Sequence, residues 1–203
     1  MYSIQKDRYH HGDLKNALLQ AAETLLAETG AAGLSLRAVA KAAGVSHTAP
    51  YRHFKDKAAL LRALAQAGFE RLRLAINAAA DAVPHDAGQK LIAAGSAYVT
   101  LAVRNPELTR LMFGGVTEPG DDDASHAADA AFESLVWIIT AGVQAGAFRD
   151  RDPYELALVA WTSMHGLAML IAAGLLQVDA GDEAQVDTLV RSVAQNLLYG
   201  ISK

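Results

Sequence analysis

The sequence predicts an all-α protein of about nine helices. In most segments between Gly and Pro residues, apolar residues recur at spacings of three and four, which is the periodicity of an amphipathic helix. No segment alternates apolar and polar residues as a half-buried strand does. With 203 residues, 52% of them apolar, the chain can bury a sizeable core, and because it lacks cysteine it must do so without disulfides.

Gly, Pro and capping residues divide the chain into the expected helices. A stripe of Leu and Ala ends at Gly30, a residue type that favours helix ends. Ser35 supplies a hydroxyl that can cap a short helix, which Gly44 stops. Asp56 precedes a long apolar stripe that continues to Pro84. The expected helices cover about residues 13–29, 36–43, 46–54, 57–84, 86–104, 106–113, 124–146, 153–176 and 183–201.

The segment 156–176 contains 21 residues without a formal charge and is long enough to cross a bilayer as a helix. Its centre, however, carries Thr162, Ser163 and His165, where a lipid-facing helix carries Leu, Ile and Val. The charges at its two ends are of mixed sign, so neither end has a positive bias. We expect no membrane span, but a helix buried in the core or in a subunit interface, with Gly166 buried where its neighbours approach.

Positive charge is concentrated near the N-terminus. Residues 1–62 contain nine Lys or Arg and five Asp or Glu, a formal charge of +4, whereas the remainder carries −8. A basic module on an acidic body is typical of a nucleic-acid-binding protein, although charge alone leaves chance clustering on a solvated face as an equal alternative. The N-terminus is polar and lacks the apolar stretch of a secretory signal, so we expect a cytoplasmic protein.

The segment 35–54 has the steric features of a helix-turn-helix. Ala40 is small enough for two helices to cross closely, and Gly44, four residues later, permits the positive φ of a sharp turn. Val45 fills the corner. Ser46 is expected to cap the second helix, whose first turn would enter the major groove of DNA.

This pattern resembles the TetR family of transcriptional regulators. The matching residues are 28–30 at the end of the first helix, the helix 35–40, the turn 44–46 and the run 51–61. The rest of the chain resembles the family in length and helical character. Within it, Trp161 and His165–Gly166, together with residues 9–14, resemble a subgroup whose C-terminal domain is marked by Trp, His and Gly.

The resemblance implies a homodimer of two-domain subunits. A helix-turn-helix domain, residues 8–62, would bind a palindromic operator in double-stranded DNA, and a helical domain, residues 63–203, would bind an effector and dimerise through the last two helices. Such regulators are usually repressors, with activation as the alternative, because the sign of regulation depends on where the operator lies. By position, the DNA-contacting residues are Ser35, Ser46, His47, Thr48, Ala49, Tyr51, Arg52, His53 and Lys57. Lys55, just beyond the second helix, is also suited to a phosphate contact.

Three residues of this segment, Tyr51, His53 and Pro50, have expected roles that differ from a simple DNA contact. Tyr51 is either a phosphate contact or a core aromatic, and His53 is expected to pack more than to read bases. Pro50 replaces the larger aliphatic residue that is usual in the family. A proline inside a helix removes a hydrogen bond, whereas one in the first turn is tolerated. We therefore expect the second helix of the motif to start late or to be short, with His47 and Thr48 still offered to the groove.

Apolar and aromatic residues in the C-terminal part are candidates for a ligand site. The resemblance implies a small-molecule effector that repositions the two DNA-reading domains when it binds. A mostly apolar pocket would favour an apolar or aromatic effector. Packing in the core or between subunits is the competing interpretation. The candidates are Tyr98, Met112, Phe113, Trp137, Trp161, Met164, His165 and Met169.

Other classes of function have little support in the sequence. A Gly-rich phosphate loop, a nucleophile elbow and a His-Glu-x-x-His motif are all missing, so we expect no enzyme. His10 and His11 with Asp13 imitate a metal site, but adjacent His residues on a terminal arm make a poor cage, so we expect neither a metal nor a cofactor. A ligand-sensing helical protein that does not touch DNA is the remaining alternative, and it leaves the basic N-terminal module unexplained.

Overall fold

The computed structural model describes residues 11–84, 86–114 and 123–201. Within these ranges the chain folds into eight α-helices and one 3₁₀ turn, η1, which confirms the all-α prediction. The elements are α1 (His11–Gly33), α2 (Leu36–Ala42), η1 (Pro50–Arg52), α3 (Lys57–Asp81), α4 (Ala87–Arg104), α5 (Pro106–Phe113), α6 (Asp123–Gln144), α7 (Pro153–Ala172) and α8 (Glu183–Ile201).

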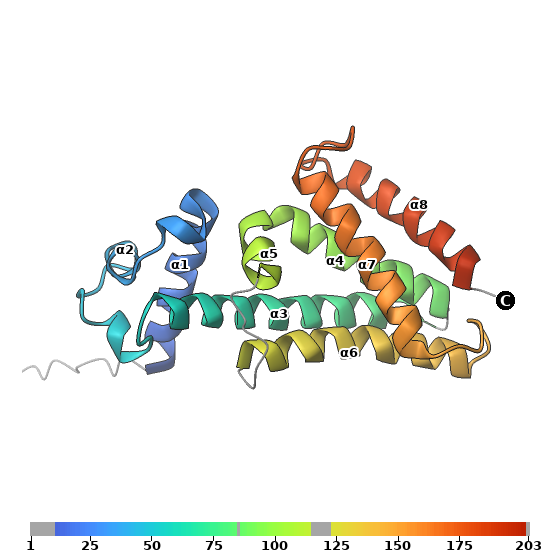
Figure 1. The fold of residues 1–203 in the computed structure, drawn as a ribbon, viewed down its shortest axis with the longest axis horizontal. Helices are drawn as coiled ribbons and strands as arrows, with labels where there is room; N and C mark the ends of the chain where they lie inside the picture. Colours follow the sequence, from blue (N-terminus) through green and yellow to red (C-terminus); the bar gives the residue numbers. More distant parts are fainter. Residues whose placement is uncertain (1–10, 85, 115–122, 202–203) are drawn as a thin grey trace, which may run out of the picture.

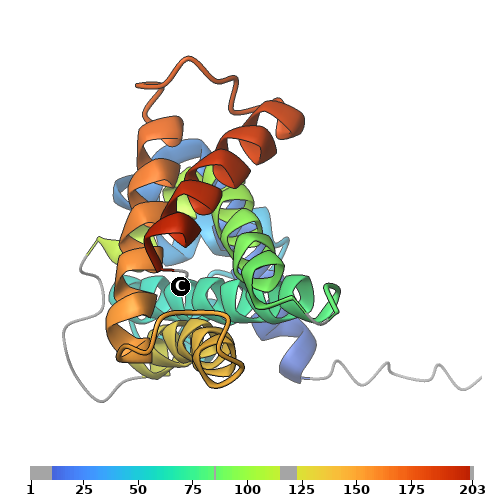
Figure 2. The ribbon, with the colours of Figure 1, turned by 90° about the vertical axis from the view of Figure 1, so that its right-hand side faces the viewer.

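The helices form a small head at one end of the molecule and a larger body (Figure 1). α1, α2 and η1 make the head, and α3 leaves the head and runs along the whole body. α4 and α5 lie on one side of α3 and α6 on the other, while α7 and α8 pack against α4. Seen from the end, α7 and α8 lie next to each other on the outside of the body (Figure 2).

Side-chain caps fix where several helices begin. The Ser35 hydroxyl accepts a hydrogen bond of 3.1 Å from the Ala38 backbone N–H, as the sequence predicts. The carboxylate of Asp56 accepts one of 2.8 Å from the Ala59 N–H at the start of α3. Each cap satisfies a backbone donor that has no partner inside its own helix.

Glycines in the left-handed region set two helix ends. Gly44 has a φ of 68° and turns the chain directly after α2, as expected for the corner of a helix-turn-helix. Gly174 also has a φ of 68° and lies just beyond α7. The expected helix over 153–176 is therefore too long at its C-terminal end, because α7 stops at Ala172.

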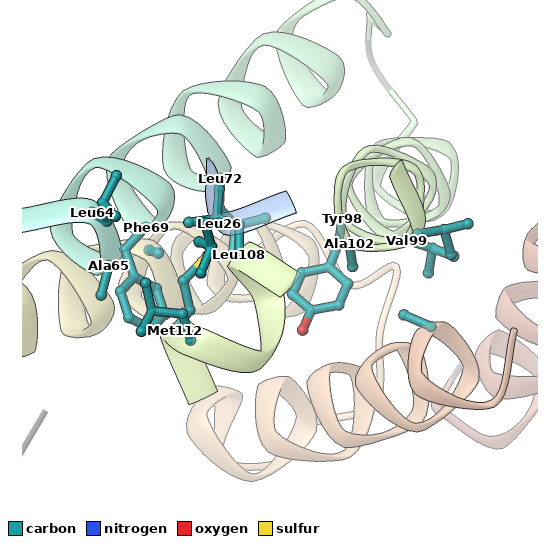
Figure 3. Packing of buried hydrophobic residues seen from close by; sticks show 14 of the residues in the cluster. Leu26, Leu64, Ala65, Phe69, Leu72, Tyr98, Val99, Ala102, Leu108 and Met112 are labelled. Atoms are coloured by element: carbon teal, nitrogen blue, oxygen red, sulfur yellow. The ribbon is translucent and has the colours of Figure 1, made fainter. Parts of the chain in front are cut away.

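One hydrophobic core continues from the head into the body. Leu26 of α1 meets Leu64 and Phe69 of α3 in this cluster, and Leu108 and Met112 of α5 complete it from the body side. Figure 3 shows these side chains together between the three helices. Two features thus attach the head to the body. The chain continues from the head into α3, and α1 packs against α5.

An ion pair on the surface also joins the head to α3. Both terminal guanidinium nitrogens of Arg71, Nη1 and Nη2, donate to the Glu23 carboxylate of α1, at 2.7 and 2.8 Å. The hydrogen bonds from Arg71 hold the pKa of Glu23 below its ordinary value, although partial burial opposes them. Because the pair is partly exposed, we expect it to contribute no more than about 1 kcal/mol to stability.

α7 is the described helix that is long and apolar enough to cross a membrane by length and composition. One side of it packs into the core through Met164, Leu167 and Ala168, as in the core helix of a folded domain. Its other side is exposed in the protomer and includes Gly166, so the expectation that Gly166 is buried within the chain is wrong. A Cβ built on Gly166 meets nothing within 4 Å.

Candidate functional site

The second helix of the helix-turn-helix is much shorter than the expected range of 46–54. It consists of the single 3₁₀ turn Pro50–Arg52, with Pro50 in its first position. The Pro50 carbonyl accepts hydrogen bonds of 2.9 Å from both His53 and Phe54. The helix therefore starts late and is short, as Pro50 predicts. Proline has no backbone N–H and cannot donate the hydrogen bond that would continue the helix towards residue 46.

Ser46 does not cap this turn, so that prediction is wrong. The cap position belongs to Ala49, which makes no side-chain capping bond and donates its N–H to the Ser46 carbonyl at 3.0 Å. The Ser46 hydroxyl instead lies 3.3 Å from the Thr48 hydroxyl. Both hydroxyls are exposed in the turn that precedes η1.

Most of the residues predicted to contact DNA lie on the exposed surface of the head. Tyr51 is 54% exposed, so the alternative interpretation of Tyr51 as a core aromatic is wrong. His53 is half-buried, with its ring centroid 6.3 Å from that of Phe54, as expected of a packing residue. Exposed members of the set are Ser35, Ser46, His47, Thr48, Tyr51, Arg52 and Lys55, and half-buried members are Ala49, His53 and Lys57.

Lys57 has a structural contact that the sequence does not reveal. Its ammonium donates a hydrogen bond of 2.9 Å to the Ala32 carbonyl in the last turn of α1, and so joins the start of α3 to the end of α1. A lysine near a helix C-terminus satisfies a carbonyl that lacks a partner in its own helix. Since an ammonium group has three donors, Lys57 retains donors for a phosphate.

Lys55→Ala and Lys57→Ala should weaken binding to all DNA duplexes and flatten the dependence of log K on log[salt] by about one unit each, because each lysine is predicted to contact one phosphate. Only Lys57→Ala should also lower the melting temperature, since it removes the bond to Ala32. Fluorescence anisotropy with a labelled duplex at several salt concentrations measures the slope. An unchanged slope in either variant would remove that lysine from the contact set.

The body encloses a cavity of about 480 Å³ between α3, α4, α5, α6 and α7, with a contribution from α8. Its lining is mostly apolar and includes Phe69, Ile76, Leu91, Tyr98, Met112, Phe113, Ala128, Asp129, Phe132, Leu135, Tyr154, Trp161, Met164 and Leu197. A largely apolar cavity of this size suits a drug-sized ligand.

Aromatic rings form a continuous wall along this cavity. The Phe69 and Phe113 centroids are 5.2 Å apart, and Trp161 lies 6.0 Å from Phe113. Phe132 follows at 5.8 Å from Trp161, and Tyr154 at 5.3 Å from Phe132. These separations are those of stacked or edge-to-face aromatic pairs. The wall therefore offers both ring faces and ring edges to a ligand.

Tyr98 and His165 form a polar pair at one side of the cavity. The Tyr98 hydroxyl lies 2.6 Å from His165 Nδ1, and Figure 3 shows it directed away from α4 towards α7. Burial raises the pKa of Tyr98, against the opposing effect of a hydrogen bond with Trp161, and burial lowers the pKa of His165. Both shifts favour the neutral forms, so a neutral hydroxyl and a neutral imidazole share this hydrogen bond.

The lowered pKa of His165 predicts a loss of stability in mild acid. The unfolded chain binds a proton at His165 near the ordinary pKa of about 6.5, whereas the folded chain binds it only at lower pH. The free energy of unfolding should thus fall as the pH drops below about 6.5. Urea unfolding at a series of pH values should show a shallower fall in His165→Gln than in the parent; identical slopes would contradict the assignment.

Five of the eight predicted ligand residues line the cavity: Tyr98, Met112, Phe113, Trp161 and Met164. His165 does not line it but holds the Tyr98 hydroxyl, and Met169 is half-buried against the core. Trp137 lies elsewhere. It is 75% exposed and borders a separate surface hollow with Lys90 and Asp81.

Several lining residues were missed by the sequence analysis, above all Asp129, Phe132 and Tyr154. A signal was present, because Ala128, Phe132 and Leu135 recur at spacings of four and three and mark one face of α6. Trp137 lies about 200° around the helix from Leu135 and hence faces away from the cavity. No group of three or more metal-binding side chains occurs among the described residues, and His10 lies outside them.

Two family models match the chain. One, described as bacterial regulatory proteins of the tetR family, matches residues 18–64, and the other, described as a tetracyclin repressor-like C-terminal domain, matches residues 91–193. The first contains the helix-turn-helix, and the second contains most of the cavity. None of the curated proteins matches the chain.

Solved structures share the fold over nearly the full length. A protein of unknown function from Rhodococcus sp. RHA1 is 38% identical, with a TM-score of 0.85, 98% of this chain covered and 100% of that chain. The TetR-family regulator PfmR from Thermus thermophilus is 21% identical, with a TM-score of 0.69 and coverages of 92% and 99%. The fatty acid degradation regulator FadR from Bacillus halodurans is 18% identical, with a TM-score of 0.74 and coverages of 92% and 98%.

Proposed function

We propose a function for this chain from its family: it belongs to the TetR family, whose members are DNA-binding transcriptional regulators and not enzymes. Members of the family bind operators, respond to small-molecule effectors and form homodimers. We propose that this chain is a cytoplasmic, ligand-responsive repressor that binds a palindromic operator as a homodimer.

We assign DNA binding to residues 8–62 and effector binding and dimerisation to residues 63–203. The observation that carries the first assignment is the exposed turn before η1. It presents His47 and Thr48 to solvent, flanked by Tyr51, Arg52 and Lys55. Arg and Lys side chains supply phosphate contacts, and His and Thr can read base edges.

We propose that α7 and α8 form the dimer interface. The outer face of α7 exposes Val159 at 47% and Leu170 at 43%, with Thr162 and Gly166 between them at spacings of three and four. Tyr199 of α8 is 79% exposed. An apolar stripe on neighbouring outer helices is what a helical subunit interface requires.

The effector site in this proposal is the cavity of the body. We place the chain in the subgroup marked by Trp, His and Gly, and the structure suggests a reason for each residue. Trp161 lines the cavity, His165 holds the Tyr98 hydroxyl, and Gly166 keeps the outer face of α7 flat. Activation in place of repression is the alternative, since operator position decides the sign.

Selection of random duplexes by the purified protein at physiological salt tests the proposal. We expect an enriched inverted repeat whose half-sites are about 34–36 Å apart, one turn of DNA, because two heads must enter successive major grooves. A pool that is not enriched, even after the protein is unfolded and refolded to remove bound ligand, would favour a ligand-sensing protein that does not bind DNA.

A further inference from the structure

We infer that the effector is an amphipathic cation, a protonated amine or a quaternary ammonium group on an apolar body, with its charge at the mouth of the cavity beside Asp129. This inference rests on the proposed effector function of the cavity and names the chemical class of the ligand. Three observations support it: the negative charge of Asp129 in the lining, the aromatic wall beside Asp129, and the hydrogen-bonded, uncharged pair of Tyr98 and His165.

The charge of the lining is negative. Among the described residues that line the cavity, Asp129 is the one with a formal charge. Asp129 is exposed and yet belongs to the lining, so its carboxylate lies where the cavity opens to solvent. A cationic head group at this mouth would stay near water and gain the attraction of the carboxylate, while the apolar body of the ligand enters the cavity.

Rings lie within reach of the same head group. Phe132 follows Asp129 by three residues on α6, so the two side chains share one face of the helix. Tyr154 and Trp161 flank Phe132, with centroids at 5.3 and 5.8 Å from it. Ring faces attract cations and give no such attraction to an anion, so the wall next to Asp129 selects the same sign of charge as the carboxylate.

The described part of the lining offers an anionic head group no cationic partner. Tyr98 and His165 already satisfy each other through the 2.6 Å contact, and burial lowers the pKa of His165, so the imidazole is neutral at physiological pH. Lys and Arg do not occur among the described lining residues. A carboxylate drawn into this cavity would lose its hydration without gaining a charged partner, which is costly.

The two tryptophans of the chain allow a direct test. Trp161 lines the cavity and Trp137 lies outside it, so Trp137→Phe leaves Trp161 as the single reporter of ligand entry. Three probes share one apolar body and differ in head group: decylamine as the cation, decanol as the neutral molecule and decanoate as the anion. We titrate each probe into the Trp137→Phe protein and follow Trp161 fluorescence.

We expect decylamine to bind about tenfold or more tightly than decanol, and decanoate to bind more weakly than decanol. Asp129→Asn should remove most of the advantage of the amine and leave the affinity for decanol unchanged. Glu133→Gln is the matched control, because Glu133 is an exposed carboxylate on the next turn of α6 that does not line the cavity. It should keep the preference for the amine.

Decanoate binding as tightly as decylamine, or an amine preference that survives Asp129→Asn, would overturn the inference. The proposed effector function fails in a different way, with no fluorescence change for any of the three probes. Trp161→Phe, which retains the exposed Trp137, checks the origin of the signal. A response to decylamine in that variant equal to that of the Trp161 reporter would show binding outside the cavity and would also overturn the inference.

Discussion

Gly166→Leu is expected to separate the proposed dimer into folded monomers and to abolish tight operator binding. In the protomer, a Cβ on Gly166 meets nothing within 4 Å, so the leucine side chain has room and the fold should survive. Leucine is also the better helix former by about 0.8 kcal/mol, so the isolated subunit should not lose stability.

In the dimer the same leucine would lie between two closely packed helices. Overpacking costs about 1–3 kcal/mol per site, and a twofold interface contains the substitution twice. A total of about 2–6 kcal/mol raises the dissociation constant of the dimer by about thirtyfold or more. Operator affinity should fall with it, because a monomer engages only one half-site.

Sedimentation velocity over a range of concentrations measures the dimer, and thermal unfolding checks the fold. Ala78→Leu is the control. Ala78 is a small, exposed residue of α3, far along the chain from α7 and α8, and it is likewise changed to leucine. It should leave the dimer intact. A Gly166→Leu protein that remains dimeric at the concentrations where the parent does would place the interface elsewhere.

The fold was predictable because its determinants are local. Apolar spacing marks each helix. Ser35 fixes the start of α2 by a hydrogen bond of 3.1 Å, and Gly44 forms the corner after α2 with a φ of 68°. Even the departure at Pro50 could be predicted, because the missing N–H of proline acts within its own turn. Ser46 shows the limit, since two hydroxyls in one turn can bond each other in place of the backbone.

The cavity was predictable only in part, because its lining depends on which face each helix turns inward. Residues on α7 share a face that is evident from their spacing, and Trp161 and Met164 do line the cavity. Trp137 is a tryptophan like Trp161, but its position around α6 directs it to solvent. Asp129 had no distinguishing feature, as an acid is ordinary on a helix surface until the packing of α6 places it at an opening.

Ala128→Phe is expected to give a repressor that binds its operator normally and no longer responds to effector. Ala128 is half-buried, lines the cavity and precedes Phe132 by one helical turn. A phenyl ring at this position occupies empty space that the effector would use. Because the cavity exists in the folded protein, the ring can be accommodated without displacing the core, so stability should be retained or increased.

The affinity for decylamine should fall by about tenfold or more, since the added ring removes space along the aromatic wall. Release of the labelled operator by decylamine should be lost at concentrations that release it from the parent protein. Ala141→Phe is the matched control, an exposed alanine on the same helix outside the cavity lining. If Ala128→Phe still released the operator at the parent's decylamine concentration, the signal that reaches the head would have to start from another site.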